Sequence, residues 1–202
     1  MVGGIVKPVS QPRVHHRSMH QAGRTLWTIG HSTRGWEVFA GMLQEAHITA
    51  LVDVRRFPGS RRNPQFSAET MAREMPHTGI AYIPMPELGG RRKVDPHTRN
   101  TAWRNDSFRG YADYMATDDY RQARDRLAVL ATAQSTAIMC AEAVWWQCHR
   151  GLIADDFKAD GWDVIHLMAP GRSEPHPYTS AARIVDGRLD YSAPEPPQAS
   201  LF

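Results

Sequence analysis

The chain has little cysteine, little lysine and no long apolar run. Only two of its 202 residues are Cys, which excludes a fold that depends on a disulfide framework. At this length one core buries about 70% of the surface that the unfolded chain exposes, so we expect a single self-sufficient domain. The longest apolar stretches are a few residues, such as 143–146 (AVWW), far below the ~20 residues that span a bilayer. The sequence therefore predicts no transmembrane helix.

The N-terminal stretch also lacks the features of a secretory signal. Residues 1–24 carry positive charge but no apolar run, unlike a signal peptide. Together with the low cysteine content, this favours a reducing, cytoplasmic setting. Pro, Gly, His and Arg are mixed there without periodicity. We therefore expect a flexible basic arm over 1–24, one domain over 25–192 and a loose tail over 193–202.

The net charge of +3 conceals an uneven distribution. Residues 1–24 carry +4, residues 25–52 carry −1, residues 53–109 carry +5 and residues 110–202 carry −5. Of the 24 cationic residues 21 are Arg, whose planar fork suits phosphates and carboxylates. Codon usage in a GC-rich genome can account for the high ratio of Arg to Lys without a functional reason. It does not account for the clustering of Arg in one part of the sequence. The cluster in 53–109 therefore indicates an anionic partner.

Apolar runs alternate with helical patterns along the domain, which predicts an α/β fold. Five runs have the length and composition of buried strands: 25–30, 49–54, 79–84, 136–140 and 162–168. Helical periodicity lies between them, so we expect one domain with a mostly parallel five-stranded sheet and helices on both faces. The segments RIV and RLDY flank the turn Asp186-Gly187, which predicts a C-terminal β-hairpin.

Polar residues follow the predicted strands, where the carboxyl ends of parallel strands form a ligand-binding edge. Two Arg-rich loops also lie there, at 55–65 and 88–109, and the second has a Gly89-Gly90 step that suits a lid. The candidates are His31 and Ser32 after the first strand, Asp53, Arg55 and Ser60 after the second, and Cys140, Glu142, Cys148, His149 and Arg150 after the fourth.

The acidic and basic candidates each have two interpretations. Asp53 ends a strand, where its carboxylate either orients a base or ribose hydroxyl, or pairs with Arg55 as a structural ion pair. The Arg residues of the 55–65 loop, with Ser60, either surround a phosphate or form a solvated basic surface. Because this loop lies at the expected ligand edge, the sequence favours anion binding by at least one of them.

The two cysteines also differ in their surroundings. Cys140 ends a buried strand, where a lone Cys is usually a small apolar residue. Cys148 lies near the start of a helix beside His149 and Arg150, so we expect the helix dipole and the neighbouring cations to lower its pKa. Such a thiolate suits nucleophilic catalysis with Glu142 or His149 moving protons. The alternative is a capping or packing role.

Metal and redox roles for the cysteines are further alternatives. Cys140, Cys148 and His149, joined by His31 or His166, supply four possible zinc ligands. However, the C-x7-C-H spacing is not a usual zinc pattern. We therefore predict neither a metal nor a cofactor. A cytoplasmic setting argues against a permanent disulfide between the two Cys, and a reversible one stays open.

Several segments together resemble a known family. They are TIGHST (28–33), LVDVRRFPGSRRNPQF (51–66), the Tyr82 to Gly90 step, and CAEAVWWQCHRGLIAD (140–155) leading to VIHL (164–167). From about residue 25 to about 190 the chain resembles the bacterial and archaeal domain of unknown function 488 family. The resemblance implies a compact α/β domain and no settled reaction. It marks as motif positions Gly30, His31, Ser32, Asp53, Arg55, Pro58, Ser60, Cys140, Glu142, Cys148, His149 and Arg150. The family's segment between the two Cys is usually polar and acidic, whereas this chain has AEAVWW.

So many polar groups at one sheet edge favour an enzyme over a scaffold, since burying them has no structural advantage. We expect a cytoplasmic enzyme that acts on a nucleotide or nucleic acid, with Arg55 and Arg150 gripping the anion. Cys148 or Cys140 is the expected nucleophile. The acid–base or orienting residues are then Glu142, His31 and Asp53, and the further substrate contacts are Ser32, Ser60 and His149. The alternatives are a nucleic-acid-binding accessory domain without chemistry and a thiol-based redox or metal sensor. We expect no membrane partner, and the sequence indicates no oligomeric state.

Overall fold

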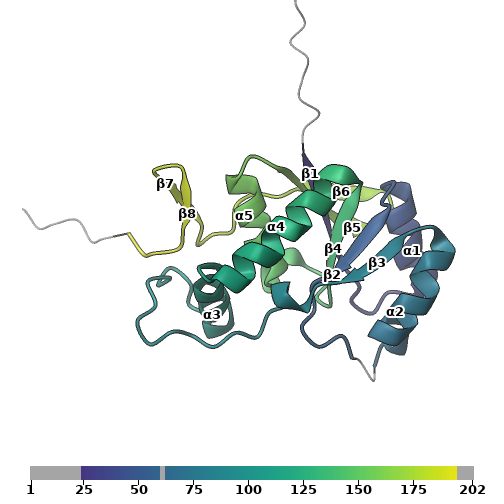
Figure 1. Ribbon diagram of the computed structural model, residues 1–202, viewed down its shortest axis with the longest axis horizontal. Coiled ribbons are helices and arrows are strands. Elements are labelled where there is room, and N and C mark those ends of the chain that lie inside the picture. Colours follow the sequence, from purple (N-terminus) through teal and green to yellow (C-terminus); the bar gives the residue numbers. More distant parts are fainter. Residues whose placement is uncertain (1–23, 60–61, 195–202) are drawn as a thin grey trace, which may run out of the picture.

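A six-stranded sheet with the order β3-β2-β4-β1-β5-β6 forms the centre of the fold. The computed structural model, drawn in Figure 1, describes residues 24–59 and 62–194. Strands β1 to β5 run parallel, and β6 pairs antiparallel with β5. The strands are β1 (Thr25–Gly30), β2 (Ala50–Asp53), β3 (Ala81–Pro84), β4 (Thr136–Cys140), β5 (Asp163–Ala169) and β6 (Arg172–Pro175).

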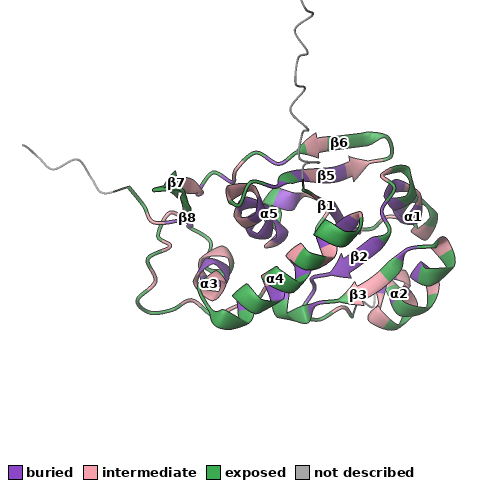
Figure 2. Cartoon of the chain, turned by 45° about the horizontal axis from the view of Figure 1, so that its top comes forward, coloured by how far each residue is buried: buried purple, intermediate pink, exposed green. Residues whose placement is uncertain are grey.

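The apolar content of each strand matches its place in the sheet. Both β2 and β4 are buried along their whole length, as expected for central parallel strands covered on two faces. The edge strand β3 is half-buried to exposed, since it has a neighbouring strand on one side only. Figure 2 shows this gradient from the buried centre to the exposed edges.

Helices cover both faces of the sheet. On one face lie α1 (Trp36–Glu45) and α2 (Ala68–Glu74). On the other face lie α3 (Asp106–Met115), α4 (Asp118–Ala133) and α5 (Arg150–Ala159). Each face has its own apolar core, which includes Ile29, Leu51 and Met139 under α1 and α2, and Leu26, Val52, Ile138 and Cys140 under α3, α4 and α5.

Three of the helices, α2, α3 and α4, begin where the sequence supplies a capping side chain. The side chain of Ser67 accepts a hydrogen bond from the Thr70 amide at the start of α2. Asn105 and Thr117 accept equivalent bonds at the starts of α3 and α4. Such caps satisfy amides that have no partner within the helix.

The structure confirms the α/β class, the mostly parallel sheet and the C-terminal hairpin of β7 (Arg183–Val185) and β8 (Arg188–Asp190). The sheet has one strand more than the five expected, because β6 (RSEP) is polar and largely exposed and gives no apolar signal. It pairs with β5 through its backbone. Nearly all of the predicted arm and tail lie outside the described residues. No helix in the ranges 24–59 and 62–194 is both long enough and apolar enough to cross a membrane.

Candidate active site

The loop between β4 and α5 folds back and brings two cysteines together. Cys140 ends β4, and Cys148 lies two residues before α5. Arg150, only 1% exposed, donates from Nη1 to the carbonyl of Glu142 (2.6 Å) and from Nη2 to that of Ala143 (2.9 Å). These two bonds hold the loop over the first turn of α5.

Gly30 at the end of β1 makes room for this loop. It pairs with Cys140 in the parallel ladder. A Cβ atom at Gly30 would lie 1.7 Å from the carbonyl oxygen of Glu142 and 2.7 Å from Nη1 of Arg150. No side chain fits at that distance, so glycine is required for the close approach of the loop to β1.

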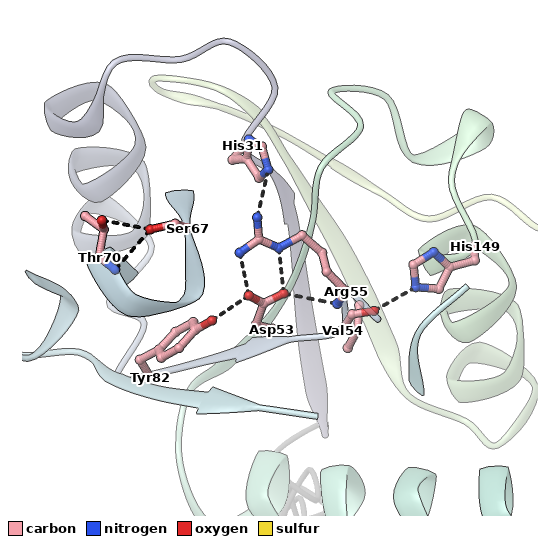
Figure 3. Close-up of polar contacts among 8 residues, drawn as sticks. All are labelled: His31, Asp53, Val54, Arg55, Ser67, Thr70, Tyr82 and His149. Carbon is pink, nitrogen blue, oxygen red and sulfur yellow. Dashed lines mark hydrogen bonds and ion pairs between the residues drawn. The ribbon is translucent and has the colours of Figure 1, made fainter. Parts of the chain in front are cut away.

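Cys140, Cys148 and His149 form what we call the thiol cluster. Nδ1 of His149 lies 3.8 Å from Sγ of Cys140 and 3.7 Å from Sγ of Cys148. Nε2 of His149 lies 3.1 Å from the carbonyl oxygen of Val54 (Figure 3). A carbonyl only accepts hydrogen bonds, so Nε2 carries the proton and donates it. Whenever Nδ1 carries no proton, its lone pair therefore faces the two sulfurs.

The two thiols of this cluster have different acidities. The hydrogen bond from the Cys148 thiol, followed by the charges of His149 and Arg150, lowers the pKa of Cys140 well below its ordinary value despite burial. Burial, followed by the neighbouring Cys140 sulfur, raises the pKa of Cys148 well above its ordinary value. The sequence-based expectation of a lowered pKa at Cys148 was therefore wrong. It considered the cations of α5 but not a second, more acidic sulfur beside it.

A cleft of about 300 Å³ opens beside the thiol cluster at the carboxyl edge of the sheet. Its lining consists of Arg55, Arg56, Phe57, Gly90, Arg91, Ser107, Phe108, Cys140, Ala141, Glu142, Gln147, Cys148 and His149. The Glu142 side chain is exposed at its rim. Arg56 donates from Nη1 to the carbonyl of Arg91 (3.0 Å), which joins the two Arg-rich loops across the cleft. The cleft thus combines sulfur, imidazole, carboxylate and guanidinium groups.

A second group of polar residues, which we call the carboxylate cluster, lies on the other face of the sheet. Arg55 donates to both oxygens of Asp53, from Nε to Oδ1 (2.8 Å) and from Nη2 to Oδ2 (2.6 Å). The hydroxyl of Tyr82 donates to Oδ2 of Asp53 (2.6 Å), and Nη1 of Arg55 lies 3.2 Å from Nε2 of His31 (Figure 3). Arg55 is always a donor, so Nε2 of His31 accepts and Nδ1 donates to the carbonyl of Ser32 (2.8 Å). Burial is the main reason that the pKa of His31 is lowered.

The model of the family described as "Domain of unknown function DUF488" matches residues 35–156. The chain belongs to the DUF488 family. The matched range starts just before α1 and ends inside α5, so it contains the whole thiol cluster. Neither the comparison with curated proteins nor the comparison with solved structures gave a match.

In this DUF488 domain several candidates from the sequence make contacts other than the expected ones. His31 and Asp53 do not line the cleft, because they belong to the opposite face of the sheet. Arg150 was expected to grip an anion, but its two Nη groups are bound to backbone carbonyls inside the protein. Arg55 lines the cleft, yet Asp53 neutralises its charge.

The two serines proposed as substrate contacts also lie outside the cleft or outside the structure. Ser32 has a positive φ of 49°, and its amide donates to the carbonyl of Ala141 (2.8 Å). It does not line the cleft. Ser60 lies outside the described residues.

Three further residues line the cleft beside the thiol cluster. Phe57 comes from the first Arg-rich loop, Arg91 from the loop after β3, and Phe108 from the first turn of α3. Arg91 and Phe108 belong to the Arg-rich stretch with interleaved aromatic residues that the sequence marks as a weak nucleic-acid signal, whereas sequence reasoning missed Phe57. The expected lid over 88–109 supplies one wall of the cleft, through Gly90, Arg91, Ser107 and Phe108.

Neither His31 nor His166 is placed to join the thiol cluster as a metal ligand. Both ring nitrogens of His31 are used within the carboxylate cluster. His166 bonds Thr28 through Nδ1 (2.6 Å) and His176 through Nε2 (2.9 Å). In the described part of the chain the group of possible metal ligands therefore consists of the thiol cluster alone.

Proposed function

We propose that this DUF488 domain is a thiol-dependent transferase or hydrolase with Cys140 as the nucleophile and His149 as the acid–base residue. The supporting observation is the contact of Cys140 Sγ with Nδ1 of His149 while the carbonyl of Val54 holds Nε2. A nucleophile, a base and a group that orients the base form the arrangement that activates cysteine in unrelated enzymes. Here a backbone carbonyl is the orienting group.

Cys148 supports the nucleophile in this proposal. Its sulfur also contacts Nδ1 of His149 (3.7 Å), and its thiol is the hydrogen-bond partner that most favours ionised Cys140. Cys148 is 4% exposed and Cys140 is 6% exposed, and both line the cleft. In this proposal a substrate reaches the sulfur of Cys140 through the cleft, and the protein shields the other sides of this residue from solvent.

We propose a phosphate-bearing substrate with a flat base, a nucleotide or nucleic acid. Arg56 and Arg91 line the cleft beside the thiol cluster, and guanidinium groups suit phosphate oxygens. Phe57 is 64% exposed in the same lining, and Phe108 lies there too. Accessible aromatic rings next to cations, here the exposed Phe57 and the half-buried Phe108, suit a base that stacks while its phosphate is bound.

The proposed reaction starts when Nδ1 of His149 takes the thiol proton of Cys140, which gives a thiolate beside a protonated imidazole. The thiolate of this pair attacks an electrophilic atom of the substrate. A bond from sulfur to that atom forms as the bond to the leaving group breaks, and protonated His149 gives its Nδ1 proton to the leaving group. Water or an acceptor hydroxyl then attacks the covalent intermediate and gives its proton to His149. Cys140 leaves as the thiolate, which restores the pair of thiolate and protonated imidazole.

We place this chemistry in the cytoplasm. Cys140 and Cys148 are both free although they lie side by side. An oxidising compartment would favour a disulfide between such neighbours, whereas cytoplasmic reductants keep thiols reduced.

Alkylation of the chelator-treated protein by iodoacetamide at pH 7, followed by intact-mass analysis, tests the nucleophile. We expect a rapid adduct at Cys140 that is absent from Cys140→Ala. The reaction should be slower by at least ~10-fold in His149→Asn, because the imidazole no longer supports the thiolate. Adenosine monophosphate and a short single-stranded DNA should each be tested as protecting ligands, and at least one should slow the adduct in low salt.

Measurements of substrate turnover can disprove the proposed thiol enzyme. The proposal is wrong if folded Cys140→Ala and Cys148→Ala variants turn over every accepted substrate as well as the parent does. Nucleic-acid affinity that falls steeply with salt, together with unchanged turnover in these variants, would instead support an accessory binding domain.

A further inference from the structure

The donor atoms of the thiol cluster have the spacing of one face of a tetrahedral metal site. The two sulfurs and Nδ1 of His149 all lie within 4.8 Å of one another. The sulfur–nitrogen separations are 3.8 Å and 3.7 Å. Zn–S bonds near 2.3 Å and Zn–N bonds near 2.0 Å at a tetrahedral angle require about 3.6 Å between these atoms. The existing side chains therefore need only small shifts to bind a metal ion.

The orientation of His149 also suits a ligand. A metal-bound imidazole usually donates its other ring N–H to a carboxylate or carbonyl, which fixes the tautomer and the direction of the free nitrogen. Here Nε2 donates to the carbonyl of Val54 (3.1 Å). Nδ1 consequently presents its lone pair to the space between the two sulfurs.

The site has three protein donors and one open direction. In the described part of the chain no fourth His, Cys, Asp or Glu belongs to the group. All three members line the cleft, so a fourth ligand would come from water or a bound molecule. Structural zinc sites are closed by four protein ligands, whereas sites with three keep an exchangeable position.

We propose that Cys140, Cys148 and His149 bind one soft divalent metal ion of the Zn²⁺ type through two sulfurs and Nδ1. Thiolate and imidazole donors select such ions over Mg²⁺ and Ca²⁺, which prefer oxygen. Each thiol that is protonated before binding releases its proton to solvent as the sulfur–metal bond forms. Because the ion would occupy the sulfur of Cys140, it would also inhibit the thiol chemistry. That inhibition rests on the proposed function, whereas the metal binding does not.

Titration of the full-length, chelator-treated protein with Co²⁺ tests the site. We expect one ion per cluster, with a thiolate-to-cobalt charge-transfer band and the intense visible bands of tetrahedral Co²⁺. Zn²⁺ should displace the cobalt spectrum, and a large excess of Mg²⁺ should not. Bound Zn²⁺ should also prevent alkylation of Cys140.

Single substitutions identify the ligands. Loss of a residue that only contacts a metal ligand lowers metal affinity by ~10–100-fold. Cys148→Ser and His149→Asn each remove a direct ligand, so the affinity for Co²⁺ should fall by more than this. Gln147→Ala is the matched control, because Gln147 lines the same cleft and offers no strong ligand. A variant with His15, His16 and His20 changed to Asn removes the imidazoles of the N-terminal stretch and should keep the thiolate band.

The outcomes separate this inference from the proposed function. Absence of a charge-transfer band in the parent protein, or a band that persists in Cys148→Ser and Cys140→Ser, overturns the metal site. If the band appears while metal-free Cys140 shows no His149-dependent alkylation, the metal site is supported and the thiol enzyme is not. Rapid alkylation without any metal band gives the opposite conclusion.

Discussion

Two residues that sequence reasoning placed in one site, Asp53 and Cys140, lie on opposite faces of the sheet. Asp53 pairs with Met139 in the parallel register, and Cys140 is the next residue of β4. Side chains alternate between the two faces of a strand, so one step of register separates the carboxylate cluster from the thiol cluster. Both residues do lie at the ends of their strands, as the sequence predicted. Register between strands depends on pairing across the sheet, which a single sequence does not reveal.

Asp53→Asn tests whether the carboxylate cluster is structural. Asp53 is 1% exposed and holds Arg55 by a bidentate ion pair. Removing one partner of a buried pair typically costs about 3–5 kcal/mol. We expect this loss in the free energy of unfolding at pH 7, measured with urea. In the folded protein the alkylation rate of Cys140 should stay close to that of the parent.

Glu74→Gln is the comparison for this prediction. Glu74 pairs with Arg73 at the surface, where their side chains are 39% and 60% exposed. Such exposed pairs contribute about 0–1 kcal/mol, so the variant should unfold almost like the parent. An Asp53→Asn protein of normal stability with slow alkylation would contradict the structural role and favour the catalytic one.

At the scale of elements, the loop after β3 limits the space around His149. A Cβ atom at Gly90 would lie 2.9 Å from Nδ1 and 3.2 Å from Cγ of His149. Real Cβ contacts are not this short, so the imidazole ring must move if a side chain is added. The loop therefore helps to hold the ring against the two sulfurs.

Gly90→Ala should disturb the thiol cluster with little effect on the rest of the fold. We expect alkylation of Cys140 to slow by about 10-fold or more, because displaced His149 no longer supports the thiolate. The free energy of unfolding should fall by about 1–3 kcal/mol, as for other overpacked sites. Iodoacetamide kinetics and urea unfolding measure the two effects.

Gly35→Ala provides the control, since a Cβ at Gly35 meets no atom within 4 Å and its φ of −65° suits any residue. Both measurements should stay near those of the parent. An unchanged alkylation rate in Gly90→Ala would show that the position of the His149 ring does not control the reactivity of Cys140.

The sequence predicted most elements but not how the β4–α5 loop closes. The apolar runs of β1 and β4 gave their bounds correctly, because buried parallel strands carry a strong composition signal. By contrast, Cys148, which the sequence placed near the start of a helix, has extended backbone with φ −134°, and α5 begins two residues later at Arg150. Arg150 looked like an anion ligand because nothing local indicates that its guanidinium binds carbonyls of its own loop.

At the scale of the whole molecule, internal contacts account for part of the basic charge. Arg92 donates to the carbonyls of Gly89 and Glu87, and Arg109 donates to that of Trp103. These arginines stabilise the loop region after β3. Part of the positive charge of segment 53–109 therefore serves the structure of the loop. A count of charges along the sequence does not distinguish these arginines from those that can bind an anion.

A buried polar chain connects distant parts of the molecule on the α5 side. Nε2 of His176 lies 2.9 Å from Oδ1 of Asp155, so the hydrogen must be on His176. Nδ1 of His176 lies 2.9 Å from Nε2 of His166, and Nδ1 of His166 lies 2.6 Å from the hydroxyl oxygen of Thr28. The hydroxyl of Tyr191 donates to Asp155 (2.8 Å). The chain links β1, β5 and α5, and the buried His166 lies at its centre.

The burial of His166 makes the stability of the whole fold sensitive to acid. Burial, followed by the charges of His176 and Arg150, lowers the pKa of His166 from 6.5 to about 2. Below pH 6.5 the unfolded chain binds a proton at this residue and the folded protein does not, so stability is full above pH 6.5 and falls as the pH falls. From pH 6.5 to pH 5 this one group should lower the free energy of unfolding by about 2 kcal/mol. Urea unfolding of the parent and of His166→Gln at pH 7, 6 and 5 measures it. The variant should be less stable at pH 7 but lose less stability on acidification, and equal pH dependence in both proteins would contradict the assignment.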